Sequence, residues 1–303
     1  MVEITGVLAM AYGTASSPDD IERYYTDIRG GRPPAPEGLN ELRERYAAIG
    51  NRFPLNEVTE RQARALEREL GSGYRVYVGM KHSPPFIPDV VVGMRDEGVT
   101  HAVAIALAPH YSKMSIGGYI DRVRRAMVDG IPSFRFVEHW YDSPSFLDVL
   151  AGRVRAARGR LTQDERSNDL LVVTAHSLPE RILAEGDPYA EQLQHTADLV
   201  AERAGIERYR IGWQSEGRTA EPWIGPPLGE IIEKAAADGH TAVVVCPAGF
   251  VSDHLEILYD LDIEAKETAE RAGVAFARTE SMNDDPEFIR ALAEIVLSRL
   301  EDR

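Results

Sequence analysis

Strand-sized apolar runs alternate with helix-length amphipathic segments along the whole chain, and this alternation limits the fold more than any other feature of the sequence. Each run stops at Gly, Pro or polar residues, which is typical of a buried strand. Strands that alternate with helices of roughly ten or more residues indicate βαβ units and a parallel sheet. We predict strands at Gly6–Ala11, Tyr74–Gly79, His101–Ala108, Ser133–Glu138, Asp169–Thr174, Tyr209–Trp213, Thr241–Pro247 and Val274–Arg278. We predict helices at Val58–Leu70, Pro88–Glu97, Tyr119–Val128, Pro144–Arg158, Tyr189–Ala204, Leu228–Asp238, Leu255–Ala272 and Pro286–Leu300.

The order of these elements repeats. Val7-Leu-Ala-Met-Ala-Tyr-Gly-Thr14 resembles Leu171-Val-Val-Thr-Ala-His-Ser-Leu178, and two shorter matches follow in the same order in each half. The repetition predicts an α/β protein of two similar Rossmann-like halves, each a parallel sheet flanked by helices. It also predicts that Tyr12 and His176 hold equivalent positions, each where the first strand of its half ends. A cleft between the halves would then place these two side chains opposite one another.

The predicted halves span residues 1–140 and 141–303, and the last helix, 286–300, is expected to pack back. The first half carries an additional stretch at about 17–57, rich in Pro, Gly, Arg and Tyr. Arg forks bind carboxylates in a bidentate manner, and Tyr rings stack on planar ligands. The stretch is therefore a candidate ligand-binding insert, and a surface helix with salt-bridged Arg is the alternative.

Charge and cysteine content exclude several classes of function. The net charge of −15 argues against nucleic-acid binding, which requires a basic face. Cys246 is the only cysteine, so neither an intrachain disulfide nor a self-contained iron–sulfur cluster is expected. No signal peptide is recognised, and no apolar run approaches the roughly eighteen residues of a membrane span. We expect a cytoplasmic protein with no permanently bound cofactor.

Two sequence motifs contain the candidate catalytic and metal-binding residues. Thr174-Ala-His-Ser-Leu-Pro179 ends a buried strand, the usual place for a ligand site in an open α/β sheet. Ser252-Asp-His-Leu-Glu256 opens a helix on which Glu256, Asp260 and Glu264 would form one acidic stripe, since they are four residues apart. An imidazole facing carboxylates suits a divalent metal and proton transfer. The alternative for the stripe is a solvated acidic face. His254 is expected to point away from it and to cap the helix.

The chain resembles the ferrochelatase family over nearly its full length, and most closely its soluble monomeric members from Gram-positive bacteria, which insert iron into coproporphyrin III. The matching segments are Met10-Ala-Tyr-Gly-Thr14, Ile21-Glu-Arg-Tyr-Tyr-Thr26, Arg45-Tyr-Ala-Ala-Ile-Gly50, Val78-Gly-Met-Lys-His82, Leu107-Ala-Pro-His110, Ala175-His-Ser-Leu-Pro179, Gly212-Trp-Gln-Ser-Glu-Gly217 and Gly249-Phe-Val-Ser-Asp-His-Leu-Glu-Ile-Leu-Tyr-Asp260. The fold of that family, two Rossmann-like halves that clasp a porphyrin, agrees with the duplication. The resemblance implies a monomer that acts on a porphyrin and Fe²⁺ in heme biosynthesis, with transient contacts to neighbouring enzymes of that pathway.

The resemblance also implies roles for individual residues. His176 and Glu256 match the catalytic, metal-side pair, and Tyr12 matches a ligand of the product iron on the opposite face of the macrocycle. Substrate contacts are implied for Tyr12, Arg29, Arg45, Tyr46, Phe53 and Tyr119, and channel or cleft positions for Lys81, His82, Asp260 and Glu264. Phe53 stands where relatives usually have Ser, which weakens the inference about the substrate. Protoporphyrin IX metallation, a sirohydrochlorin cobalt or iron chelatase, and a non-catalytic porphyrin or heme carrier are the alternatives.

Overall fold

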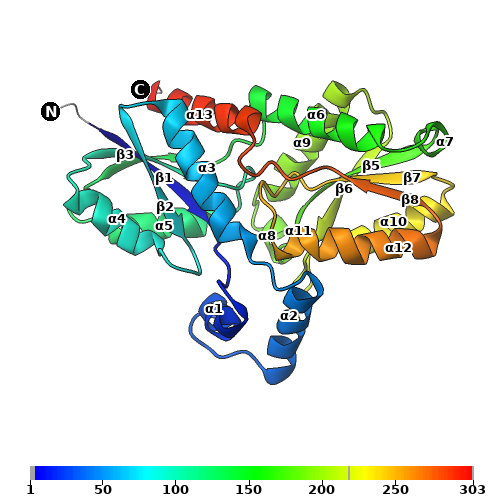
Figure 1. Cartoon of the computed structure of the whole chain (residues 1–303), viewed down its shortest axis with the longest axis horizontal. Helices are drawn as coiled ribbons and strands as arrows, with labels where there is room; N and C mark the ends of the chain where they lie inside the picture. Colours follow the sequence, from blue (N-terminus) through cyan, green and yellow to red (C-terminus); the bar gives the residue numbers. More distant parts are fainter. Residues whose placement is uncertain (1–3, 218, 302–303) are drawn as a thin grey trace.

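Two four-stranded parallel sheets of identical topology form the centre of the molecule (Figure 1). The computed structural model describes residues 4–217 and 219–301. The first sheet has the order β2-β1-β3-β4 and the second the order β6-β5-β7-β8. The strands are β1 Thr5–Ala11, β2 Tyr74–Met80, β3 His101–Ala106, β4 Ser133–Val137, β5 Asp169–His176, β6 Tyr209–Gln214, β7 Ala242–Cys246 and β8 Ala275–Arg278. The predicted fold class and its internal duplication are confirmed.

Each sheet has its topological switch point beside its first strand. From β1 the chain continues to β2 on one side and then to β3 on the other, and β5 relates to β6 and β7 in the same way. Ligand sites of open α/β sheets lie outside the carboxyl ends of the strands at such a point. Tyr12 directly follows β1, and His176 is the last residue of β5. The two residues therefore hold equivalent places in the two halves.

Helices cover both faces of each sheet. In the first half α3 and α13 lie on one face and α4 and α5 on the other, whereas α6 and α9 face α10 and α12 across the second sheet. The longer helices are α1 Ile21–Ile28, α2 Pro36–Ala48, α3 Pro54–Leu70, α4 Ile87–Asp96, α5 Ile116–Ala126, α6 Pro144–Gly159, α9 Tyr189–Ala204, α10 Leu228–Ala237 and α13 Pro286–Glu301. The shorter ones are α7 Gln163–Arg166, α8 Arg181–Ala184, α11 Leu255–Leu258 and α12 Lys266–Ala272. Among the described helices, none combines the length and the apolar character that a bilayer span requires.

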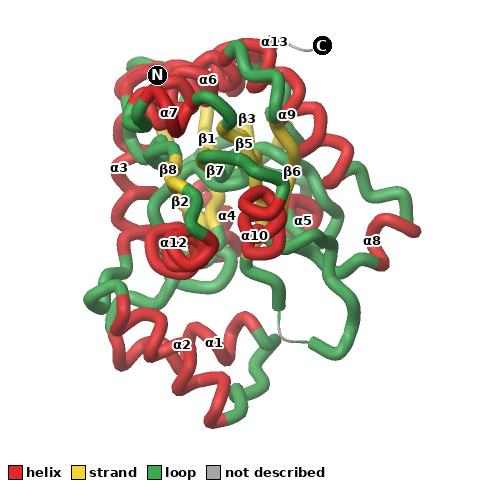
Figure 2. Tube along the Cα trace, turned by 90° about the vertical axis from the view of Figure 1, so that its right-hand side faces the viewer, coloured by secondary structure: helices red, strands yellow, loops and turns green. Residues whose placement is uncertain are grey.

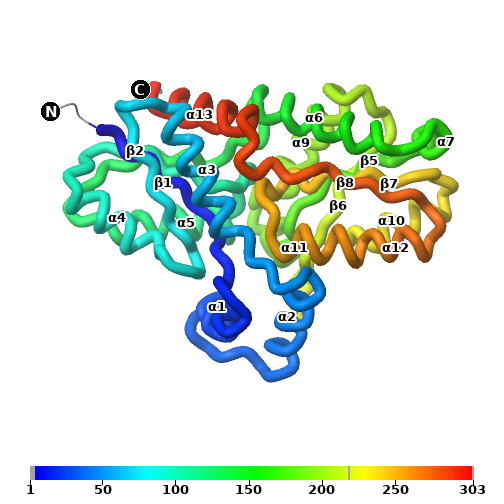
Figure 3. The backbone as a smooth tube through the Cα atoms, viewed as in Figure 1, coloured from blue at the N-terminus to red at the C-terminus, as the bar shows by residue number. Residues whose placement is uncertain are grey.

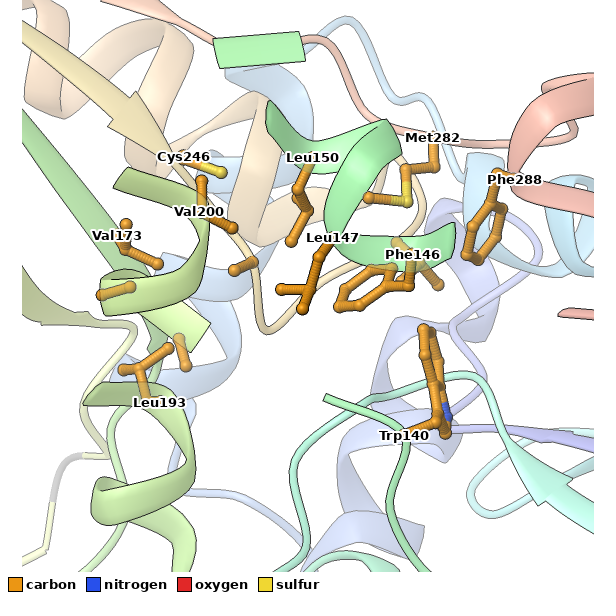
Figure 4. Packing of buried hydrophobic residues seen from close by; sticks show 14 of the residues in the cluster. Trp140, Phe146, Leu147, Leu150, Val173, Leu193, Val200, Cys246, Met282 and Phe288 are labelled. Atoms are coloured by element: carbon orange, nitrogen blue, oxygen red, sulfur yellow. The ribbon is translucent and has the colours of Figure 1, made fainter. Parts of the chain in front are cut away.

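One apolar core joins the two halves. Trp140, which lies between β4 and α6, packs edge-on against Phe146 with the ring centroids 4.7 Å apart, and also contacts Phe288 of α13 (Figure 4). The same buried cluster extends to Val173 of β5 and to Val103 of β3. Because aromatic side chains bury large areas, these contacts contribute to the packing of the two halves against each other.

The stretch between β1 and α3 forms a separate small layer made of α1 and α2 (Figures 2 and 3). Its apolar side, which includes Tyr24 and Leu39, packs against Leu255 and Leu258 of α11. The insert of the first half therefore touches the helix that carries Glu256 in the second half.

The helix predicted over Leu255–Ala272 begins and ends at these residues, but it is not α-helical throughout. Four residues of α11 are followed by a π-helical turn, Asp260–Ala265, before α12 begins. The Tyr259 carbonyl accepts hydrogen bonds from the amides of both Ile263 and Glu264. A π-turn adds a residue to the helical repeat, so the side chains that follow it are rotated relative to those that precede it.

Candidate active site

His176 presents one ring nitrogen to the site. Its Nδ1 contacts the carbonyl oxygen of Ser177, and the Tyr189 hydroxyl donates to the His176 carbonyl at 3.0 Å, which fixes the end of β5. A carbonyl can only accept a hydrogen bond, so we assign the proton of the neutral ring to Nδ1. The lone pair is then on Nε2, which lies 3.7 Å from Glu256 Oε1. This nitrogen can accept a proton or bind a metal.

Glu256 lies in the first turn of α11, between two imidazoles. Its other oxygen, Oε2, is 3.4 Å from Nε2 of His254, and its side chain is 29% exposed. Burial raises the pKa of Glu256, but His176, His254 and Arg45 outweigh burial and lower it to about 2. The group is therefore a carboxylate at neutral pH, and it is the negative charge next to the lone pair of His176.

The prediction that His254 points away from Glu256 is wrong. His254 has an extended backbone, with φ −159° and ψ −178°, immediately before the helix. Helical spacing therefore does not apply to it, and its Nε2 turns toward Glu256 while its Nδ1 donates to Ser252 O at 2.8 Å. Its side chain makes no capping hydrogen bond to the helix. Burial lowers the pKa of His254, but Glu256 reverses this effect and the net pKa is raised.

A π-turn begins at Asp260, so regular four-residue spacing does not extend from Glu256 to Glu264, although the charges of Glu256 and Glu264 both act on Asp260. Asp260 is buried and contacts the Arg45 guanidinium and the Ser215 hydroxyl. Burial raises its pKa to about 6, although Arg45 acts in the opposite direction. Glu264 is exposed to solvent. The carboxylates of the predicted stripe therefore differ in their surroundings, since Asp260 is buried and paired and Glu264 lies at the surface.

The end of β1 is lined by aromatic rings and cations. Tyr12 is 40% exposed, and its ring lies 4.6 Å from that of His82, whose Nδ1 is 2.6 Å from an Asp27 carboxylate oxygen. Lys81 Nζ lies over the rings of Tyr12 and Tyr119, at 5.8 and 5.2 Å from their centroids. Burial lowers the pKa of Lys81 to about 8 and that of His82 to about 4.

Arg122 is a site residue that the sequence analysis missed. It lies three residues after Tyr119 on α5, so both share one face of that helix. Its charge lowers the pKa of Lys81 and acts in the same direction on Tyr12. Within the described part of the chain, neither Lys81 nor Arg122 forms an ion pair through its side chain. The two cations are therefore available to an anionic ligand.

The remaining predicted residues belong to the insert. Arg29 is exposed at the end of α1. Arg45 lies over the Tyr259 ring at 4.6 Å and is joined to Asp260, so its guanidinium already has an anionic partner. The Tyr46 hydroxyl lies 2.7 Å from Thr14 Oγ1, and its ring stacks on Phe53 at 4.5 Å. The contacts predicted between these side chains and a substrate remain predictions.

No three His, Cys, Asp or Glu residues are grouped as a metal site in residues 4–217 and 219–301. The binding of a metal by His176 and Glu256 remains a prediction, and the two side chains lie 3.7 Å apart.

Comparison with known proteins gives a consistent result. Residues 4–300 match the family model described as ferrochelatase. A coproporphyrin III ferrochelatase of Geobacillus kaustophilus is 47% identical over 97% of this chain and 95% of its own length. The enzyme of the same name from Bacillus subtilis is 46% identical, with 97% of each chain covered.

Solved structures show the same fold at low identity. SirB from Bacillus subtilis with Fe³⁺ superposes with a TM-score of 0.60 at 11% identity, covering 98% of this chain and 95% of its own. The sirohydrochlorin chelatase SirB of the subspecies spizizenii, in complex with cobalt, gives 0.58 at 11% identity, covering 99% and 96%. Because identity to these structures is so low, they support the fold alone, whereas the full-length sequence matches establish the relationship: the chain belongs to the ferrochelatase family.

Proposed function

We propose that this protein is a metal-chelatase lyase that inserts Fe²⁺ into coproporphyrin III and releases coproheme in heme biosynthesis. The observation that carries the proposal is the pairing of His176 Nε2 with the Glu256 carboxylate, 3.7 Å apart, where β5 ends. The names of the full-length relatives supply the substrate. Iron is a substrate in this reaction and not a resident cofactor.

The reaction replaces two pyrrole N–H protons with one Fe²⁺ ion, so two protons must leave the macrocycle. We assign His176 Nε2 as the base that accepts one of these protons, because its Nδ1 is already committed to the Ser177 carbonyl; the second proton leaves to solvent. Glu256 stabilises the imidazolium that forms, since its low pKa keeps it anionic at neutral pH. General-base assistance of this kind is worth roughly 10²–10⁴ in rate. Before the proton transfer, the same Nε2 lone pair and the Glu256 carboxylate are the proposed ligands of the incoming iron, and His176 takes up the proton only after the iron has left it.

The end of β1 is assigned to holding the macrocycle. Tyr12 follows the equivalent strand end, burial first and the charge of Glu256 second raise the pKa of Tyr12, and the Tyr12 hydroxyl is the proposed axial ligand of iron in the product. The half-buried Phe53 and the buried rings of Tyr119 and Tyr46 are the proposed aromatic contacts of the macrocycle. Lys81 and Arg122 are cations without a carboxylate partner among the described residues, and the propionates of coproporphyrin III supply such carboxylates. Arg29 at the end of α1 is a further proposed propionate ligand. Charge-assisted hydrogen bonds of this type are the strong ones.

We assign the path of iron or protons to Glu264 at the surface and Asp260 in the interior, and we propose the buried His82 as a further residue of the cleft. Fe²⁺ must stay reduced before insertion, so we place the reaction in the cytoplasm. We also propose that the protein is a monomer that makes transient contacts with neighbouring heme-pathway enzymes. Cell fractionation and sedimentation of the purified protein test these two points.

The proposal is tested by anaerobic metallation with three tetrapyrroles: coproporphyrin III, protoporphyrin IX and sirohydrochlorin. Fe²⁺ insertion is followed by the change in the Soret and Q bands, with enzyme-free samples as the control. We expect the highest kcat/KM with coproporphyrin III. A preference for either other tetrapyrrole would correct the substrate. Tight porphyrin binding without metallation above the enzyme-free rate would indicate a carrier and refute the enzyme.

A further inference from the structure

Helix α3 of the first half reaches the loop that precedes Glu256 in the second half. Gln62, which is 1% exposed, donates from Nε2 to Asn283 O at 2.8 Å. Its Oε1 accepts from the Ser252 hydroxyl at 3.3 Å. One buried amide therefore joins two segments of the second half, and each of its two functional groups is used.

Asn283 holds the segment that Gln62 touches. Its backbone N–H donates to Val251 O at 2.9 Å. In its side chain, Oδ1 accepts from Asp253 N at 2.9 Å and Nδ2 donates to Asp253 Oδ2 at 2.9 Å. The Ser281 hydroxyl adds a bond to Asp253 Oδ1 at 2.7 Å. Asn283 has φ 45°, a left-handed conformation that Asn tolerates better than most residues. The loop before α11 is thus fixed through side chains and backbone together.

Contacts continue from this loop to the site. The Ser252 carbonyl accepts from His254 Nδ1 at 2.8 Å, and His254 Nε2 lies 3.4 Å from Glu256. Glu256 in turn faces His176. An unbroken series of polar contacts therefore leads from α3 of the first half to the proposed base in the second.

We propose that Gln62 is a positioning residue that sets the place of Glu256, and thereby the geometry of the Glu256–His176 pair, from the opposite half of the molecule. This inference rests on the proposed metallation activity. Gln62 is buried and its side chain bonds only Ser252 and Asn283 among the described residues, so it would act through these two residues. Its location on α3 ties the metal-side carboxylate to the half that carries Lys81 and Arg122, which we assign to porphyrin binding.

The test compares Gln62→Met with Arg61→Met. Methionine keeps the length of the Gln62 side chain and removes both hydrogen bonds. Arg61 lies next to Gln62 on α3 and bonds Asp284 at 3.1 Å and Glu57 at 2.8 Å, and among the described residues its side chain forms no hydrogen bond or ion pair with the loop before α11. We expect Gln62→Met to lower kcat roughly tenfold, the usual scale for a partner of a metal-side residue. Its Kd for coproporphyrin III, from fluorescence quenching, should stay within about twofold of wild type, as should kcat of Arg61→Met.

The outcomes separate this inference from the proposed function. An inactive wild-type protein would refute the function itself. Active wild type together with a folded Gln62→Met of normal kcat, or with equal losses in Gln62→Met and Arg61→Met, would refute the positioning role. Thermal unfolding reports whether the variant is folded. Should Gln62→Met not fold, Ser252→Ala takes its place in the same kcat measurement, and a normal kcat would again refute the positioning role. This variant removes one hydroxyl of the same series of contacts and leaves the hydrogen bond between Gln62 and Asn283.

Discussion

The ends of β1 and β5 are equivalent by topology and opposite in chemistry. Tyr12 at the end of β1 lies among Lys81, His82 and Arg122, whereas His176 at the end of β5 lies beside Glu256. Both residues directly follow or close the first strand of a sheet with the same order. The duplicated fold thus supplies two places for a ligand, and the loops and helices that follow decide which charge each place carries.

We propose that the two strand ends have separate roles. The cationic end of β1 binds an anionic macrocycle, and the anionic end of β5 receives the metal and the protons. A symmetric pair of sites could not do this, since Fe²⁺ and a porphyrin with propionate groups demand opposite charges. The insert of α1 and α2 adds to the asymmetry, because it belongs to the first half and packs against α11 of the second.

The largest expected effect comes from removing the base at the end of β5. His176→Ala should reduce the rate of Fe²⁺ insertion by roughly a hundredfold or more, the lower end for loss of a general base. Stopped-flow absorbance with saturating coproporphyrin III measures this rate. His195→Ala is the matched control, because that imidazole lies on α9 away from the site. A loss of less than a few fold would show that another group accepts the proton.

The cationic end should respond in binding and not in rate. Arg122→Met removes a charged hydrogen-bond donor, and we expect Kd for coproporphyrin III to rise roughly tenfold. Arg125→Met on the same helix is the control, because Arg125 is exposed and its charge does not act on Tyr12 or Lys81. Equal effects of the two variants would mean that only general charge matters and that Arg122 has no contact with the propionates.

A smaller effect is expected from the residue equivalent to His176. Tyr12→Phe keeps the ring and removes the hydroxyl, so the insertion rate should change by about threefold, the scale of one hydrogen bond. The Soret band of the ferric coproheme complex should shift, because the proposed axial ligand is lost. A rate loss as large as that of His176→Ala would contradict the division between the two ends.

The smallest effect concerns stability. The pKa of Asp260 is raised from 3.8 to about 6 in the folded protein, mainly by burial. An acid with a raised folded-state pKa stabilises the protein below its unfolded pKa, and this contribution is lost as the pH rises through about 6. Asp260→Asn removes it, so the Tm of wild type minus that of the variant should fall between about pH 4 and pH 7. A difference in Tm that is constant over this range would contradict the assigned shift.

The sequence was sufficient to predict the strands, the duplication and the positions of His176 and Tyr12. Apolar runs that end at polar or Pro residues are a local signal, and the end of a parallel strand is a defined place. Helical spacing failed where the backbone leaves the regular helix, namely at His254 before α11 and at the π-turn after Tyr259. Neither departure has a signature in the apolar pattern.

Long-range polar pairs could not be predicted for a different reason. Arg45 and Asp260 are 215 positions apart, and Gln62 and Ser252 are 190 apart, so only the folded chain brings them together. Arg122 could have been found, because its spacing of three from Tyr119 places both on one helix face. The boundary proposed near residue 140 remains a prediction, since Trp140 belongs to the core shared by both halves.

We assign metal chemistry to the end of β5 and porphyrin binding to the end of β1. The most direct test is a single-turnover experiment in which Kd for coproporphyrin III and the rate of Fe²⁺ insertion at saturation are measured for His176→Ala and for the double variant Lys81→Met/Arg122→Met. We predict that His176→Ala loses rate and keeps Kd, whereas the double variant loses affinity and keeps the saturated rate. Proportional losses of both quantities in both variants would contradict the account.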